Sequence, residues 1–186
     1  MSGSDGRHGQ LVEPGGWSRF GPRRRGRLVG QTLAPPEDTP SPPRYSSRMK
    51  IGLVSCGKGK QSGTHAARDL YTSTLFKESL AWAEARCDVV YVISDKHGLL
   101  SLDQRVEEYE VDMAEFTKEE RDEWGWRVRA ALKLKPPVEV YILAGEMYVE
   151  ALKLNRMPGV TVHTPLEGKP RGKRVQWLQE KNRHGT

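Results

Sequence analysis

Short apolar segments alternate with helical patterns from residue 50 onward, and this alternation constrains the fold more than any other feature. Apolar runs at residues 50–55, 89–94 and 138–144 are typical of buried strands, and a shorter run follows at 160–163. Strands that alternate with helices at this spacing predict an α/β fold. We expect three layers, with a mostly parallel sheet of about four strands and flanking helices.

The segments between these strands contain signals for helix starts and ends. Ser73 is placed to cap a helix, and Thr117 begins a capping box with Glu120. The helix after Thr117 is expected to end before Pro136. Further helices are expected at residues 145–154 and 172–181, whereas residues 95–116 show no sustained period and are predicted to be irregular.

The first 48 residues differ in composition from the rest of the chain. They contain 8 of the 19 glycines and 7 of the 12 prolines, with isolated Leu-Val pairs and no sustained period. Such a composition predicts a disordered tail over residues 1–48. We therefore expect one α/β domain over residues 49–181 and a flexible C-terminus over residues 182–186. Met49 begins a clean strand, so a natural start there, with the preceding residues an upstream misassignment, stays open.

The charge of the chain follows the same boundary. Eight arginines and four carboxylates give the first 48 residues a net charge of +4, out of +6 for the whole chain. A basic chain ordinarily suggests a polyanionic partner. Here most of the excess lies in the tail, so net charge alone gives no argument that the domain binds nucleic acid.

Composition also bears on location and on cofactors. The chain has no run of 18 apolar residues and no apolar stretch of signal-peptide length near its start, so we expect a cytoplasmic protein without a membrane partner. Cys56 and Cys87 lack the spacing of a metal site and are too few for a disulfide framework. They are expected to be reduced thiols, and no metal or cofactor is predicted.

In open α/β sheets, ligands bind beyond the carboxyl ends of the strands, which directs attention to the loops there. The loop from Ser55 to Lys60 combines two glycines with Lys58 and Lys60, a composition suited to a phosphate. It lacks P-loop spacing, and a solvated turn is the alternative. Arg68 and Tyr71 either complete an anion site or cap the next helix.

The loop after the second strand has the richest chemistry. Asp95, Lys96 and His97 follow directly on Ser94, with Gly98 and Asp103 shortly after. Carboxylate, amine and imidazole offer acid, base and electrostatic options near neutral pH. The alternative is that these three polar residues stand together at one strand end by chance, with Lys96 simply solvated.

Two other features are open to two interpretations each. The acidic segment 107–112 is a solvated loop, unless Glu108 or Tyr109 folds back over the strand ends. In that case Glu108 would partner Asp95 or Asp103, a pairing that stabilises a cationic, sugar-like transition state. Cys56 lies near two lysines and is either a packed, inert thiol or a nucleophile or redox sensor.

Several of these motifs together resemble those of a known family. They are Ser55-Cys56-Gly57-Lys58, the segment 94–100 with Leu102-Asp103 and Tyr109, and Leu143-Ala144-Gly145 with Tyr148. In order and type they resemble the motifs of the YaaA peroxide-stress proteins and their smaller bacterial and phage relatives. The resemblance implies an α/β fold with the motif loops at one site, and a link to DNA binding and oxidative stress. YaaA proteins are much longer and usually have an aromatic residue where His97 stands.

These observations lead to two hypotheses about function. The first is an enzyme acting on a nucleotide or nucleic-acid base, by cleavage or exchange at an N-glycosidic bond. Its catalytic residues would be Asp95, His97 and Glu108. The residues expected to bind the substrate or its phosphate are Ser55, Lys58, Lys60, Arg68, Tyr71, Ser94, Lys96, Gly98, Asp103, Tyr109, Gly145, Tyr148 and Glu167.

The second hypothesis is a DNA-binding stress protein without catalytic activity. Basic residues near the last expected helix would then contact phosphates: Lys169, Arg171, Lys173 and Arg174. Both hypotheses name a nucleotide or nucleic acid as the partner, and neither predicts an oligomeric state.

Overall fold

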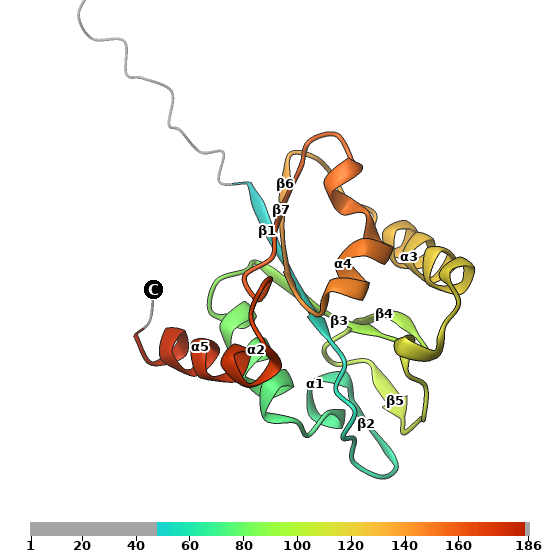
Figure 1. Cartoon of the computed structure of the whole chain (residues 1–186), viewed down its shortest axis with the longest axis vertical. Helices are drawn as coiled ribbons and strands as arrows, with labels where there is room; N and C mark the ends of the chain where they lie inside the picture. Colours follow the sequence, from blue (N-terminus) through green and yellow to red (C-terminus); the bar gives the residue numbers. More distant parts are fainter. Residues whose placement is uncertain (1–47, 185–186) are drawn as a thin grey trace, which may run out of the picture. The chain divides into compact units, whose positions relative to one another are not determined.

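A computed structural model describes residues 48–184, and the predictions for residues 1–47 and 185–186 lie outside this range. Its centre is a five-stranded sheet in the order β4-β3-β1-β6-β7 (Figure 1). The strands are β1 Met49–Ser55, β3 Val89–Ser94, β4 Gly98–Ser101, β6 Val138–Leu143 and β7 Val160–His163. All neighbours pair in parallel except β3 and β4, which are antiparallel. The mostly parallel α/β sheet is thus confirmed, with five strands instead of about four.

The segment predicted to be irregular contains the additional strand. Ser94 pairs with Gly98 across a tight hairpin, where Gly98 has a φ of +72°, so β4 returns antiparallel to β3. A second, two-stranded sheet joins β2 Thr64–Ala66 to β5 Arg105–Glu107. The prediction that residues 95–116 are irregular was wrong for β4 and β5, because strands of three or four residues are too short to show a period.

The two helices with predicted caps begin directly after Ser73 and Thr117. The helix expected over residues 145–154 runs from Glu146 to Leu152. The Ser73 side chain accepts a hydrogen bond from the Phe76 amide, and both bonds of the Thr117–Glu120 capping box are present. The last helix continues to Arg183, past the expected end at Lys181. The helices are α1 Ala67–Leu70, α2 Thr74–Glu84, α3 Lys118–Leu132, α4 Glu146–Leu152 and α5 Arg171–Arg183, with 3₁₀ turns η1 Met113–Glu115 and η2 Leu154–Arg156.

Within residues 48–184, none of the helices has both the length and the apolar character needed to cross a membrane.

Helices cover both faces of the sheet. On one face α2 and α5 pack over Val54, Val92 and Leu143, and on the other α3 and α4 pack over alternate residues of the same strands, such as Leu53 and Ile142 (Figure 1). Residues on both faces of the central strands are therefore buried, as parallel strands require. The chain forms the predicted three layers.

The strand order places a topological switch point at the centre of the sheet. The connection that leaves β1 leads to β3 on one side, whereas the connection that leaves β6 leads to β7 on the other. At their carboxyl ends β1 and β6 are joined by a long hydrogen bond, from the Ser55 hydroxyl to the Leu143 carbonyl at 3.4 Å. Where connections diverge in this way, open α/β sheets have a crevice for ligands.

Candidate functional site

A cleft of about 640 Å³ opens at this switch point. It draws its walls from the loop after β1, from Asp95 after β3, from the segment before and within η1, and from the starts of α4 and α5. The residues that line it are Ser55, Cys56, Gly57, Lys58, Lys60, Leu75, Asp95, Glu110, Val111, Asp112, Glu115, Gly145, Met147, Tyr148, Lys169, Pro170, Arg171 and Arg174. Loops separated by more than 100 residues thus meet at one site.

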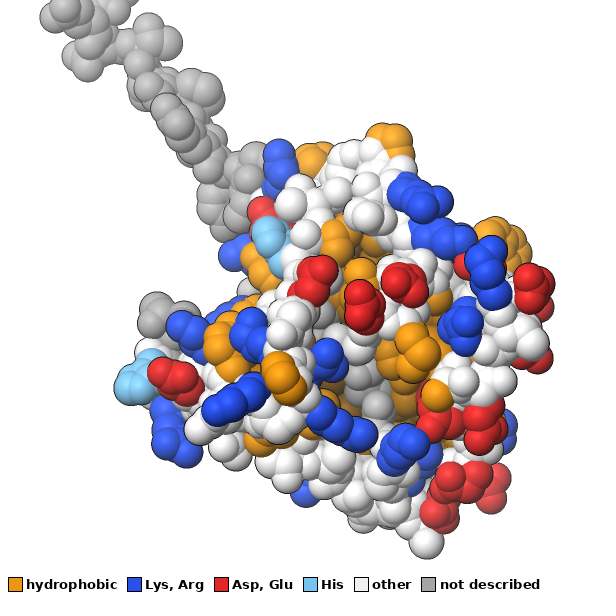
Figure 2. All heavy atoms as spheres, in the orientation of Figure 1, with side chains coloured by type: hydrophobic (Ala, Val, Ile, Leu, Met, Phe, Trp, Pro, Cys, Tyr) orange, Lys and Arg blue, Asp and Glu red, His pale blue; other side chains and the backbone are white. Residues whose placement is uncertain are grey.

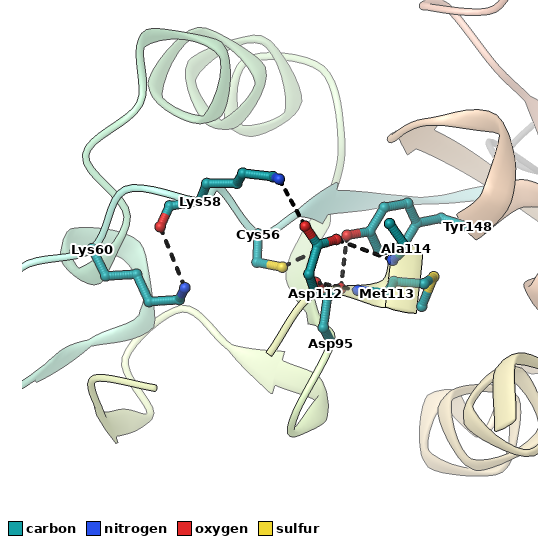
Figure 3. Close-up of polar contacts among 8 residues, drawn as sticks. All are labelled: Cys56, Lys58, Lys60, Asp95, Asp112, Met113, Ala114 and Tyr148. Atoms are coloured by element: carbon teal, nitrogen blue, oxygen red, sulfur yellow. Dashed lines mark hydrogen bonds and ion pairs between the residues drawn. The ribbon is translucent and has the colours of Figure 1, made fainter. Parts of the chain in front are cut away.

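Asp95 is the most deeply placed ionisable residue of the cleft, with 6% of its surface exposed. The Tyr148 hydroxyl donates to one carboxylate oxygen at 2.7 Å, and the Met113 amide donates to the other at 3.1 Å (Figure 3). A buried carboxylate needs such partners to offset its desolvation. Because the donors come from α4 and η1, the orientation of the carboxylate is fixed from two sides.

Cys56 lies beside this pair, with its sulfur 3.8 Å from the Tyr148 hydroxyl. Burial, together with the negative charge of Asp95, raises the pKa of the Cys56 thiol to about 11. Burial is also the main cause that raises the pKa of Tyr148, and the charges of the neighbouring Cys56 and Asp95 raise it further. Near neutral pH both groups therefore keep their protons, and the environment of Cys56 favours a packed thiol over a nucleophile.

Basic side chains form one wall of the cleft. Lys58 and Lys60 come from the loop after β1, while Lys169, Arg171 and Arg174 come from the entry to α5. Arg174 is held by a hydrogen bond from its Nε to the Lys169 carbonyl at 2.7 Å. Figure 2 shows basic side chains gathered over α5. This wall suits an anionic ligand.

The opposite wall is acidic, with Glu110, Asp112 and Glu115. Lys58 reaches across to it, and its Nζ lies 2.8 Å from a carboxylate oxygen of Asp112 (Figure 3). The hydrogen bond from Lys58, and next the one from the Ala114 amide, lower the pKa of Asp112. Asp112 in turn raises the pKa of Lys58. The two walls are thus already linked by an ion pair.

A closed polar network lies outside the cleft lining. The Tyr109 hydroxyl lies 2.6 Å from the Ser94 hydroxyl and 2.9 Å from the Tyr71 hydroxyl. All three residues are buried, and burial raises the pKa of Tyr71 to about 12. The acidic segment was expected either to be a solvated loop or to fold back over the strand ends, and its Tyr109 does fold back. These three predicted site residues anchor that segment and do not line the cleft.

The structure places Lys96 and His97 against the Tyr109 ring, outside the cleft lining. The Lys96 Nζ lies 5.7 Å from the ring centroid, and the His97 ring meets it edge-on at 5.2 Å. Burial and the charge of Lys96 lower the pKa of His97. Gly98 serves the hairpin turn. Thus Asp95 alone among residues 95–98 contributes to the cleft.

Four other predicted site residues also lie outside the cleft lining. Arg68 pairs with Glu84 at 2.9 Å and with Asp103 at 3.5 Å. Glu108 is exposed on the segment after β5, and Glu167 accepts a hydrogen bond from the Thr164 hydroxyl. The cleft therefore contains these predicted site residues: Ser55, Lys58, Lys60, Asp95, Gly145 and Tyr148.

Some cleft residues were absent from the predicted enzyme site. Three residues assigned to the DNA-binding hypothesis, Lys169, Arg171 and Arg174, line the same cleft as Asp95. Asp112 was visible only as part of an acidic run, because its pairing with Lys58 depends on how the chain folds back after β5. Met147 carried no sequence signal that distinguishes it from a core methionine.

Comparison with known proteins places the chain in a family. Residues 51–180 match the family of unknown function DUF6884, a range that includes every residue of the cleft. No curated protein matches the chain.

Proposed function

Because the chain belongs to the DUF6884 family, whose function is unknown, we propose an activity from the chemistry of the cleft itself. The protein is an enzyme that cleaves or exchanges the N-glycosidic bond of a nucleotide, free or within nucleic acid. The observation that supports this most is a buried, oriented carboxylate, Asp95, in a cleft with a basic wall. The basic wall suits the phosphate, and the carboxylate suits a sugar that becomes positively charged.

In the binding step, the phosphate of the nucleotide meets the basic wall. Lys58 and Lys60 approach it from the β1 loop, and Arg171 and Arg174 from the start of α5. Met147, which is 40% exposed at the cleft, offers apolar surface to a base. Phosphate contacts of this kind position the sugar next to the Asp95 carboxylate.

In the chemical step, the bond between the sugar and the base breaks and its electrons leave with the base. The carboxylate of Asp95 stabilises or attacks the anomeric carbon, where positive charge develops. Water, or a second base, then forms the new bond at that carbon and loses a proton to solvent; where Asp95 had attacked, its bond to the carbon breaks in this step and the carboxylate is regenerated. The departing base takes up a proton from solvent, so the overall reaction consumes and releases one proton. Tyr148 acts as a positioning residue, because it holds the Asp95 carboxylate by a 2.7 Å hydrogen bond. His97 and Glu108 no longer belong to the proposal, since both lie outside the cleft lining.

The test is base release from a panel of nucleotides and modified DNA, followed by chromatography. Asp95→Asn keeps the shape of the side chain and should lower the rate by at least about 100-fold, the scale on which a positioned catalytic group contributes. Asp103→Asn is the matched control, because the Asp103 side chain is 91% exposed and pairs with Arg68. No base release by the wild type, or equal rates for the wild type and Asp95→Asn, would show that the proposal is wrong.

A second candidate, DNA binding without catalysis, is supported by a groove that adjoins the cleft. Lys169 lines both, and the groove continues along α5 past Lys173 to Arg183. The resemblance to YaaA proteins adds the oxidative-stress response to this candidate. Binding through phosphates must weaken steeply with salt. Lys173→Gln should reduce both the DNA affinity and its salt slope, whereas Lys133→Gln at the end of α3 should change neither. DNA affinity that does not respond to salt would rule this candidate out.

For either candidate we propose the cytoplasm as the compartment, since Cys56 and Cys87 are both free thiols.

A further inference from the structure

Lys58, the lysine proposed to bind phosphate, already has an anionic partner. Its Nζ lies 2.8 Å from the Asp112 carboxylate, although its side chain is 75% exposed and free to reach into the cleft. Asp112 itself lines the cleft. A phosphate that enters must therefore share Lys58 with Asp112 or replace it.

Asp112 is the more firmly held of the two partners. Its side chain is only 34% exposed, and its second oxygen accepts a hydrogen bond from the Ala114 amide at 3.0 Å. The next residue, Met113, is fully buried and its amide is bonded to Asp95. The turn that carries Asp112 is thus anchored in the protein, so Lys58 is the partner that can move.

We propose that Asp112 is an internal competitor for the ligand's phosphate: it binds Lys58 in the empty cleft, and the phosphate takes its place. This inference rests on the proposed function, because it requires an anionic ligand in this cleft. It adds a specificity-determining residue that touches neither the sugar nor the base.

Asp112 opposes an anionic ligand in two ways. It occupies a lysine that would otherwise be available, and its charge repels a phosphate nearby. A ligand therefore has to bring enough negative charge to displace Asp112 from Lys58, so Asp112 makes the cleft discriminate among anions, against those of low charge and in favour of those of high charge. The opposite arrangement, in which Asp112 only aligns Lys58 for the phosphate, predicts that Asp112 assists binding.

Pyrophosphate binding, measured by calorimetry on the full chain, separates these two arrangements. Asp112→Asn should bind pyrophosphate about two- to five-fold more tightly, the range set by a partly exposed ion pair. Lys58→Gln should bind it more weakly, and adding Asp112→Asn to Lys58→Gln should recover only part of the gain seen in the wild-type background. Asp122→Asn is the control, because it breaks a comparable ion pair, with Lys153 at 2.6 Å, outside the cleft lining.

A second measurement needs no ligand. Amine-reactive labelling of Lys58, resolved by peptide mass spectrometry, should be faster in Asp112→Asn than in the wild type, because the ion pair no longer holds the ammonium form. An unchanged labelling rate would show that the pair does not form and would overturn the inference.

Each outcome of the pyrophosphate measurement either supports or overturns the inference about Asp112. Equal or weaker pyrophosphate binding by Asp112→Asn overturns the inference and leaves the proposed function standing if base release is observed. No pyrophosphate binding by any variant, the wild type included, overturns the inference, and the base-release assay then judges the proposed function on its own.

Discussion

The two helix pairs that cover the sheet are packed in different ways. On one face α3 and α4 meet backbone to backbone, because a Cβ atom at Gly125 would lie 1.9 Å from the Ala151 carbonyl oxygen. Arg129 adds hydrogen bonds to the carbonyls of Ala151 and Leu152. On the other face α2 and α5 meet through side chains, with the rings of Trp82 and Trp177 6.3 Å apart.

This difference matches a division of roles in the cleft. The closely packed pair includes α4, which supplies Tyr148 and so fixes the Asp95 carboxylate. The other pair includes α5, whose one buried residue is Leu178 and whose start supplies Arg171 and Arg174 to the basic wall. Chemistry requires a fixed geometry, whereas charge attraction tolerates movement. We therefore expect damage to the two faces to have different consequences.

The largest effect is expected from filling the contact between α3 and α4. Gly125→Val should destabilise the fold by about 4 kcal/mol, above the usual cost of overpacking, because the obstacle is a backbone carbonyl that cannot rotate away. Chemical denaturation measures this. Gly172→Ala on α5 is the control, since nothing lies within 4 Å of its added Cβ, and its stability should be unchanged or slightly higher. Equal stability of both variants would contradict the close packing of α3 on α4.

A somewhat smaller effect is expected from emptying the core under α5. Leu178→Ala removes the residue that anchors this helix and should cost about 3 kcal/mol. It should also weaken pyrophosphate binding, while Asp95 and Tyr148 keep their geometry. Leu152→Ala, at an equally buried position on α4, is the matched variant and should instead lower the rate of base release. If the two variants affect binding and rate alike, the proposed division between the faces is wrong.

A third and smaller effect concerns the network of buried hydroxyl groups. Tyr109→Phe keeps the ring but leaves the hydroxyls of Tyr71 and Ser94 without their shared partner, at a cost of about 1.5 kcal/mol. The acidic segment should then exchange its amide hydrogens faster, as hydrogen-exchange mass spectrometry can show. Tyr91→Phe, on a half-buried strand position, should leave both stability and exchange nearly unchanged. A Tyr109→Phe variant as stable as the wild type would show that the Tyr109 hydroxyl does not anchor the acidic segment.

The smallest effect is the difference between the two thiols. Burial is the first cause that raises the pKa of both Cys56 and Cys87 to about 11, and the charges of Asp95 and Asp88 add to it. Alkylation at neutral pH should therefore be slow for both and differ by no more than about three-fold. Selective, rapid alkylation of Cys56 would instead restore the redox-sensor interpretation.

The raised pKa values of the two thiols also determine whether the stability of the fold rises or falls with pH. The unfolded chain loses its thiol protons near pH 9, before the folded protein does, so stability should fall as the pH rises from 9 to 11. Thermal unfolding across this window checks the direction.

The elements with clear local signals were predictable from sequence. The caps at Ser73 and Thr117 and the long apolar strands are present as expected, because each depends on residues close in the chain. The short strand β4 was missed, since it arises from a tight hairpin after β3 and carries no period of its own. Local chemistry thus predicted the main layers of the fold but not its shortest strands.

The cleft was predictable only in part, for a geometric reason. Asp95, Lys96 and His97 are adjacent in the sequence, but they occupy a turn, where successive side chains point in different directions. Asp95 is buried in the cleft, whereas the other two lie against the Tyr109 ring. The pairing of Lys58 with Asp112 joins residues that only the folded chain brings together.

The central position of β1 bears on how the protein is made. Met49–Ser55 is translated first among the strands of the sheet, yet one of its edges pairs with β3 and the other with Val138–Leu143. On the ribosome, this second edge has no partner until β6 has been synthesised and has left the exit tunnel. An unpaired central strand with apolar side chains on both faces is a site for association with other nascent chains. Synthesis of β6 therefore ends the period in which the nascent chain is most exposed to misassembly.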